Sequence, residues 1–217
     1  MANKLVLYQK QKIQQLDQAL WQAILGEKEN AQFWRVRQQP SNYPQSFDNN
    51  AANSVKALLS FVRDVHQHKY ALSQQQETQI EQHLQQLTWS DAGAMLLRFK
   101  QIHYDLELAN QVIAKRLEKP LCLSGMPTQK ARYFKNVVKQ FFIKKVQVEA
   151  VHLTQRYQQL MPDYLFLEEQ LQKASPKSYK TWKSQRDQVF QQALVASKTH
   201  VNYIKQLFDQ CGLSVGL

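Results

Sequence analysis

The chain has 217 residues, 43% of them hydrophobic, and its 28 Lys and Arg outnumber 17 Asp and Glu to give a formal net charge of +11. This hydrophobic content excludes a wholly disordered chain, and 5 Gly with 6 Pro are too few to punctuate a barrel or sandwich of many short strands. Gln, Lys, Leu and Ala, all good helix formers, dominate. We therefore predict an all-α protein, a compact bundle of about six to seven helices with one long basic helix.

Apolar residues that recur every three or four positions predict the helices in chain order. The predicted ranges are 5–25, 48–70, 73–87, 90–117, 128–160, 163–171 and 175–211. Thr128 is the expected N-cap of the long basic helix, and Met161-Pro162 is expected to end it. Residues 27–49 contain Pro40, Pro44 and four aromatic residues, so we expect an ordered loop there rather than a regular helix.

A break in the helical pattern at Lys119–Pro127 divides the chain. Residues 1–120 form the predicted N-terminal helical region, and 121–217 form a C-terminal basic helical region that we expect to pack with it as one unit. The charge is uneven across this boundary, with a balance of +3 before it and +8 after it. A local excess of positive charge indicates a binding surface for polyanions.

The long basic helix carries the densest charge, since residues 130–145 hold six cations, four aromatic rings and no carboxylate. On a helical wheel Arg132, Lys135 and Lys139 lie within about 60° of one another, so they are expected to project together into solvent. The alternative is an ordinary solvated face. The apolar residues form two sets roughly 130° apart, expected to face different neighbours. The first set is Phe134, Val137, Phe141 and Val148, and the second includes Phe142, Val146, Leu153, Tyr157 and Leu160.

A second basic cluster lies at the start of the last helix, where Lys177, Lys180, Lys183 and Arg186 border Tyr179 and Trp182. Arginine beside aromatic rings can hold a carboxylate in a bidentate manner or stack on a base. The alternative interpretation is that Trp182 belongs to the core and contacts no ligand.

Signals of an enzyme are missing from the sequence, so we expect a non-enzymatic protein with no cofactor and no metal. His66 and His68 point to different sides of a helix, and His103 near Asp105 suits a surface hydrogen bond better than acid–base chemistry. The sequence has no signal peptide and no apolar run long enough for a membrane span, so we expect a cytoplasmic protein with no membrane contact. In that reducing compartment Cys122 and Cys211 are expected to be buried thiols rather than a disulfide.

Three segments resemble the primosomal replication protein N'' family, commonly called PriC. Pro127-Thr-Gln-Lys-Ala-Arg132-Tyr-Phe-Lys135 is similar to that family's entry into a basic helix, and Gln185-Arg186 with Ala193-Leu194 is similar to its last helix. Phe47-Asp48 resembles its Phe-Asp-Arg segment, although Asn49 stands where the family has Arg.

The resemblance implies a replication-restart factor that binds single-stranded or forked DNA and the acidic tail of the single-stranded-DNA-binding protein, and that aids loading of the replicative helicase. It places Arg132 and Arg186 in the tail pocket. The alternative, from another class, is a structural or regulatory adaptor that binds a partner protein through Phe141 and Phe142 without nucleic acid. The candidate residues for nucleic-acid or acidic-peptide binding are Arg132, Tyr133, Lys135, Lys139, Lys180, Trp182, Lys183 and Arg186.

Overall fold

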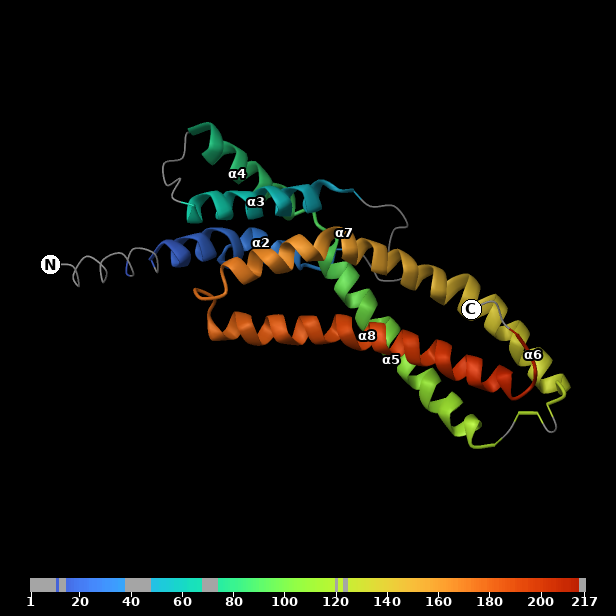
Figure 1. Ribbon diagram of the computed structural model, residues 1–217. Coiled ribbons are helices and arrows are strands. Elements are labelled where there is room, and N and C mark those ends of the chain that lie inside the picture. Colours follow the sequence, from blue (N-terminus) through green and yellow to red (C-terminus); the bar gives the residue numbers. More distant parts are fainter. Residues whose placement is uncertain are drawn as a thin grey trace. The chain divides into compact units, whose positions relative to one another are not determined.

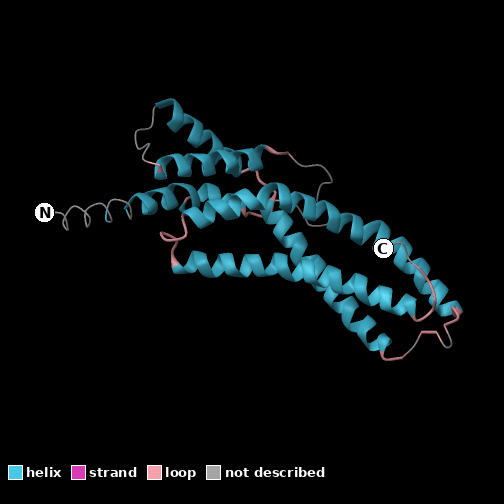
Figure 2. Cartoon of the chain, viewed as in Figure 1, coloured by secondary structure: helices cyan, strands magenta, loops and turns pink. Residues whose placement is uncertain are grey.

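The computed structural model describes residues 11, 15–37, 48–67, 74–119, 121–122 and 125–214. Figure 1 shows the chain, and Figure 2 shows helices joined by loops, with no strand in these residues. The elements, in chain order, are η1 (Gln22–Gly26), α2 (Lys28–Phe33), α3 (Asn50–His66), α4 (Gln74–Leu87), α5 (Ala92–Leu117), α6 (Gln129–Val137), η3 (Val138–Gln147), α7 (Val148–Gln170) and α8 (Lys177–Asp209). The predicted all-α class is confirmed.

The predicted number of helices is wrong, because abutting segments join into five long helices in the described chain rather than six to seven. The main cause lies at Pro162, which was expected to end the basic helix but stands inside α7. A proline in a helix interior costs about 3 kcal/mol. Leu160, Met161 and Tyr164 beside it are fully buried, so their packing outweighs that cost.

The described residues divide into two units that differ from the predicted halves. Unit 1 contains the chain up to Met95 together with Arg156–Ser184, and unit 2 contains Leu96–Gln155 and the chain from Gln185 onward. Three helices, α5, α7 and α8, contribute residues to both units. The predicted boundary near residue 120 therefore lies within unit 2.

Unit 1 has a core of aromatic rings around Tyr164. The Phe33 ring stacks on Tyr164 with centroids 4.8 Å apart, and the Trp34 indole Nε1 donates a hydrogen bond to the Tyr164 hydroxyl (3.0 Å). Lys28–Phe33 is helical, which corrects the prediction that residues 27–49 contain no regular helix. The predicted loop residues Pro40, Pro44 and their neighbours lie outside the described residues, as do residues 5–10 and 12–14 of the predicted helix 5–25.

Within the same unit α3 and α4 lie side by side (Figure 1). The Ser54 hydroxyl donates a hydrogen bond to Gln86 Oε1 (2.6 Å) between these helices. The apolar residues predicted to face inward from α3 are buried, which confirms that stripe: Val55, Leu58, Leu59, Val62 and Val65.

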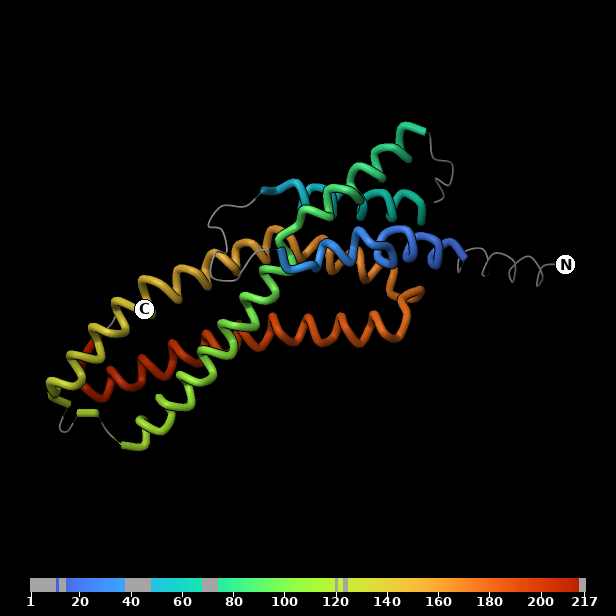
Figure 3. The backbone as a smooth tube through the Cα atoms, turned by 180° about the vertical axis from the view of Figure 1, so that it is seen from behind, coloured from blue at the N-terminus to red at the C-terminus, as the bar shows by residue number. Residues whose placement is uncertain are grey.

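Unit 2 is built on the second half of α8, beside which α6 and η3 run (Figures 1 and 3). Phe134 of α6 packs on Phe208 of α8, with centroids 5.5 Å apart. Phe99 of α5 meets Phe190 of α8 edge to face at 5.2 Å. These ring contacts hold α5 and the basic helix against α8.

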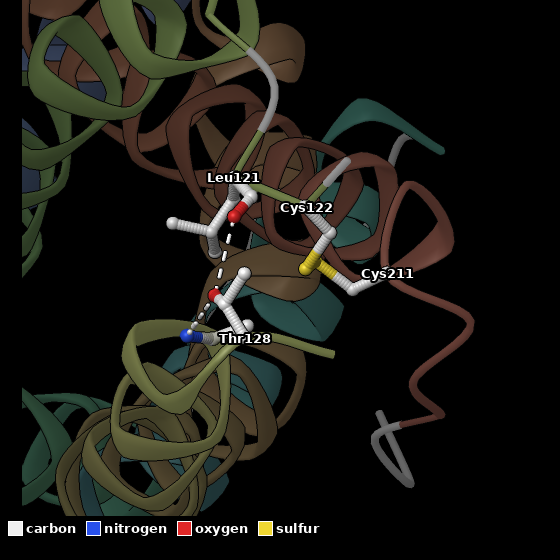
Figure 4. Close-up of a disulfide and its surroundings, with 5 residues drawn as sticks. Leu121, Cys122, Thr128 and Cys211 are labelled. Carbon is white, nitrogen blue, oxygen red and sulfur yellow. Dashed lines mark hydrogen bonds between the residues drawn. A yellow bond between two sulfur atoms is a disulfide. The ribbon is translucent and has the colours of Figure 1, made fainter. Parts of the chain in front are cut away.

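A disulfide joins Cys122 to Cys211 across 89 positions of the sequence (Figure 4). Both residues are buried in a small cluster with Ala131, against which Leu121 and Leu213 pack. The prediction of two free thiols is therefore wrong. It assumed a reducing compartment, and sequence spacing could not show that the segment after α5 meets the end of α8, where the two Cα atoms are 5.1 Å apart.

Candidate functional site

The basic helix begins at Thr128, as predicted. Its hydroxyl accepts a hydrogen bond from the Ala131 amide (3.2 Å) and donates one to the Leu121 carbonyl (3.2 Å) (Figure 4). The cap satisfies one of the free amides of the first turn. Because Thr128 also bonds to the segment next to Cys122, the start of the helix is tied to the disulfide.

An exposed surface, which we call the basic-aromatic face, follows α6 and η3. Its members are Arg132, Tyr133, Lys139, Phe141, Lys144 and Lys145. Tyr133 is 74% exposed and Phe141 is 57% exposed. The sequence contains no Asp or Glu between residues 119 and 148. The face therefore presents two aromatic rings among four cations with no acidic residue in the same stretch.

The cations of this face make local contacts rather than ion pairs. Lys145 Nζ lies 5.3 Å from the centroid of the Phe141 ring, and Lys144 Nζ donates a hydrogen bond to Gln140 Oε1 (2.9 Å). Arg132 and Lys139 form no ion pair with any carboxylate in the described parts of the chain. Their charge is available to an anionic ligand.

The structure corrects the predicted arrangement of apolar residues on this helix. Val137, Phe141 and Val148 were expected to face a neighbouring element, but all three are exposed. Val138 is buried instead, whereas Phe142, Leu153 and Leu160 of the second set are buried as predicted. The buried side of this stretch is the one shared by Val138 and Phe142, which lie four positions apart and so fall together on a regular helical wheel. The segment η3 is π-helical, with hydrogen bonds that reach five residues along rather than four. Turns of this kind are often found at functional sites.

Lys135 departs from the predicted row of three cations. Arg132 and Lys139 are exposed, as expected, whereas Lys135 is half-buried. The prediction of three cations projecting together therefore holds for two of them. Lys144 and Lys145 extend the positive surface along η3. Both lysines lie in the stretch of sequence without carboxylates, which was the sequence evidence for a positive surface. A helical wheel at 100° per residue does not place them beside Arg132, so they were not among the predicted site residues.

A buried histidine supports the face from beneath. The Phe142 ring of η3 lies 4.5 Å from the His200 ring of α8. His200 Nδ1 lies 2.8 Å from Asn110 Oδ1 on α5, and Asn110 Nδ2 donates to the Ala196 carbonyl (3.1 Å). Since the amide nitrogen is used in that bond, its oxygen accepts the proton of a neutral His200. This contact joins the three helices of unit 2.

The burial of His200 makes unit 2 sensitive to acid. Burial lowers the pKa of His200 from an ordinary 6.5 to about 4. Between these values the unfolded chain binds a proton that the folded chain does not, so the free energy of unfolding should fall by up to about 3 kcal/mol as pH decreases from 6.5 to 4. Denaturant unfolding at several pH values measures this slope.

The matched test of that slope uses two variants that each lose one histidine. His200→Gln should flatten the pH dependence between pH 6.5 and 4, while His152→Gln, at a half-buried position of α7, should keep it. Equal slopes in the two variants would show that His200 does not titrate as its burial requires.

The predicted residues at the start of α8 behave differently from the basic-aromatic face. Lys180 is exposed. Lys183 Nζ lies 3.6 Å from Glu168 Oε2, and that carboxylate also accepts a hydrogen bond from the Tyr179 hydroxyl (2.7 Å). The half-buried Trp182 ring lies 5.3 Å from the Trp34 ring. Trp182 and Lys183 therefore belong to the packed side of unit 1. For Trp182 this agrees with the alternative interpretation, in which the ring is part of the core.

Arg186 is internal to unit 2. Its side chain is fully buried, and its Nε and Nη2 both donate to Asp187 Oδ1, at 2.9 and 2.6 Å. A guanidinium in this position cannot line the rim of a pocket open to solvent. The expected pairing of Arg132 with Arg186 around an acidic peptide is therefore not seen, because Arg132 is exposed and Arg186 is enclosed.

Neither a metal centre nor a membrane span emerges from the described residues. No three His, Cys, Asp or Glu side chains among them gather as possible metal ligands. Among the described helices, none is both long and apolar enough to cross a bilayer.

The chain belongs to a family described as protein of unknown function (DUF3080), whose sequence model matches residues 1–215. This match corrects the resemblance to the primosomal replication protein N'' family, because the whole chain is assigned to a different family. The shared segments around Arg132 and Arg186 were short and basic, and such segments occur in unrelated helices. No curated protein and no solved structure matches the chain.

Proposed function

We propose that this chain is a non-enzymatic binding protein whose basic-aromatic face holds single-stranded nucleic acid. The observation that carries the proposal is the exposure of Tyr133 and Phe141 among cations without acidic partners. Proteins that bind single strands combine a positive surface along the backbone with aromatic rings on which bases stack. Both features occur on this one face.

Single strands suit the face better than duplexes. A base can lie flat on an aromatic ring only where it is unstacked from its neighbours, as in a single strand. Tyr133 and Phe141 are eight positions apart, or about 12 Å at the rise of a helix. Lys139, Lys144 and Lys145 lie near the second ring in sequence and would contact phosphates.

The proposal is narrower than the function implied by the resemblance. Replication restart, the tail of the single-stranded-DNA-binding protein and the replicative helicase were supported only by the resemblance, which the family assignment removes. Binding of single-stranded DNA stands on the exposed rings and cations alone. RNA offers the same phosphates and bases, so it is an equal candidate ligand.

The disulfide bears on where this binding takes place. The predicted cytoplasmic location led to the expectation of free thiols, but Cys122 and Cys211 are joined. Disulfides persist in oxidising compartments and are rare in the cytosol. We therefore propose that the chain meets its ligand where this disulfide persists, and binding should be measured without reductant.

A second candidate function is an adaptor that docks a partner protein on the same face. Val137, Val148 and Val151 are exposed along the helix that carries the face. Aliphatic side chains contribute nothing to base stacking but suit a protein partner. Phe142, which was expected to join such an interface, is buried against His200 and cannot take part.

The test is fluorescence anisotropy with a labelled oligo-dT at several salt concentrations. Lys139→Gln/Lys144→Gln should weaken binding tenfold or more and reduce the slope of log affinity against log salt by about 1.4, since each phosphate contact with a single strand contributes about 0.7. Tyr133→Ser/Phe141→Ser should weaken binding without changing the slope, because stacking releases no counterions.

The charge-matched control is Lys56→Gln/Lys173→Gln, which removes two exposed cations from unit 1 and should leave affinity unchanged. Absence of oligo-dT binding at low salt, or equal losses in the control, would refute the proposal. Poly-glutamate and vesicles of anionic lipid are tested in parallel. Tighter binding of either one than of oligo-dT would assign the face to an acidic protein or to a lipid surface.

A further inference from the structure

Trp89 is an exposed ring on a rigid turn of unit 1. It lies between α4 and α5 and is 77% exposed. The turn is held by backbone hydrogen bonds from Trp89 N to the Gln86 carbonyl (3.1 Å) and from Ser90 N to the Leu87 carbonyl (3.0 Å). A ring left this exposed buries little area and so adds little to folding. Tryptophan and arginine are the residues most enriched among those that dominate binding interfaces.

A second segment of unit 1 brings Arg37 to this ring, with Arg35 two positions before it in the chain. The Arg37 guanidinium lies 5.1 Å from the centroid of the Trp89 ring, and Arg37 Nη2 also donates to Gln32 Oε1 (3.2 Å). Arg35 and Arg37 are both exposed on either side of Val36. The Arg35-Val36-Arg37 segment therefore lies beside the Trp89 ring, which is distant from it in the sequence.

The arginine segment is fixed in place. A Cβ at Gly93 would stand 2.2 Å from the Trp34 carbonyl oxygen, so only glycine allows α5 to approach the backbone at Trp34 and Arg35 this closely. The Trp34 indole is in turn bonded to Tyr164. Arg35 therefore leaves a packed anchor, and the patch is preorganised rather than loose.

The local charge is positive. Asp91, two positions from Trp89, is bound by Arg156, whose Nε lies 3.0 Å from each carboxylate oxygen and whose Nη2 also donates to it. Its negative charge is therefore already compensated. Arg35 forms no ion pair with any carboxylate in the described ranges. An anion approaching Trp89 meets the Arg37 guanidinium, and Arg35 is exposed two positions away along the same segment.

We propose that this Trp89 patch, formed by Arg35, Arg37 and Trp89, is a second contact for single-stranded nucleic acid, in which Trp89 stacks on a base and the arginines bind the adjacent phosphates. Arg37 covers part of the ring and leaves the rest open to the base. Arginine and aromatic rings cooperate in this manner in single-strand binding. This proposal rests on the proposed function, since it assumes the same single-stranded nucleic acid as ligand, but it adds a site on unit 1.

The experiment uses the full chain and two readouts with one oligo-dT. Trp89 is the most exposed of the four tryptophans, all of which are described, so oligo-dT should quench the intrinsic fluorescence mainly through it. Trp89→Leu should abolish most of the quenching and weaken binding about tenfold by anisotropy, within the range for losing one stacked base. Arg35→Gln/Arg37→Gln should weaken binding and lower the salt slope by about 1.4.

The matched control is Trp182→Phe, which changes a half-buried tryptophan and should keep both affinity and most of the quenching. An oligo-dT that binds wild type and Trp89→Leu equally would overturn the Trp89 site while leaving the basic-aromatic face intact. No binding to wild type would overturn both proposals. Quenching through Trp89 by poly-glutamate but not by oligo-dT would overturn the nucleic-acid assignment in favour of an acidic peptide.

Discussion

Replacing both Cys122 and Cys211 by alanine should lower the free energy of unfolding by about 4 kcal/mol. The disulfide closes a loop across 89 positions, and the entropy lost by the unfolded chain on closing a loop of this length is worth about 4 to 5 kcal/mol in the chain-entropy model. For a chain of this size such a loss lowers the melting temperature by roughly 10 °C. Thermal unfolding of the oxidised protein and of the variant measures the difference.

Reduction provides the control for lost side-chain packing. A dithiol reductant should destabilise the wild-type chain nearly as much as the double substitution does, and it should have no effect on the variant. An unchanged melting temperature on verified reduction would show that the disulfide does not constrain the unfolded chain. The effect on the start of the basic helix is separate, because the Thr128 cap is a hydrogen bond that reduction leaves in place.

Local sequence signals predicted the local structure well. The N-cap at Thr128, the inward stripe of α3 and the start of the last helix near Pro176 all follow from interactions within a few residues of the chain. The lack of ion pairs along the basic helix could also be predicted locally, because a helical stretch without carboxylates offers few nearby partners to its cations. The exposed cations Arg132 and Lys139 follow from that rule.

The errors arose where distant segments decide the outcome. The burial of residues around Tyr164 allows α7 to continue past Pro162. Cys122 lies close to the end of α8, which permits a disulfide that was not expected from the sequence. Arg186 looked like an exposed cation by sequence, but it packs inside unit 2 beside Asp187. In each case tertiary packing outweighs a local sequence preference, and a single sequence does not show which distant residues will pack together.

The candidate sites show the same division. The basic-aromatic face lies on one helix, so Arg132, Tyr133 and Lys139 could be named from sequence, although Phe141 was expected to face a neighbour and is exposed. The Trp89 patch joins two segments more than fifty positions apart. Nothing in the sequence around Trp89 or around Arg35-Val36-Arg37 indicates that the two segments meet.

Asp91→Ala should be among the most destabilising single substitutions in unit 1, lowering the free energy of unfolding by about 3 to 5 kcal/mol. The Arg156 side chain is 2% exposed and the Asp91 side chain 17%, so removing the carboxylate takes from a buried guanidinium a charged partner that water cannot replace. Arg156→Met should cost less, because the remaining carboxylate lies nearer to solvent.

The double variant Asp91→Ala/Arg156→Met separates the pair's own contribution from the cost of leaving one charge unpaired. With both charges gone, the methionine fills most of the space and nothing charged stays buried, so the double variant should be more stable than Asp91→Ala alone. Urea unfolding of all four proteins closes the cycle. Additive losses would mean that Arg156 draws its stability from packing and not from Asp91. The expected opposite, a rescue of Asp91→Ala by Arg156→Met, would assign the lost stability to the buried Arg156 guanidinium that has lost the Asp91 carboxylate.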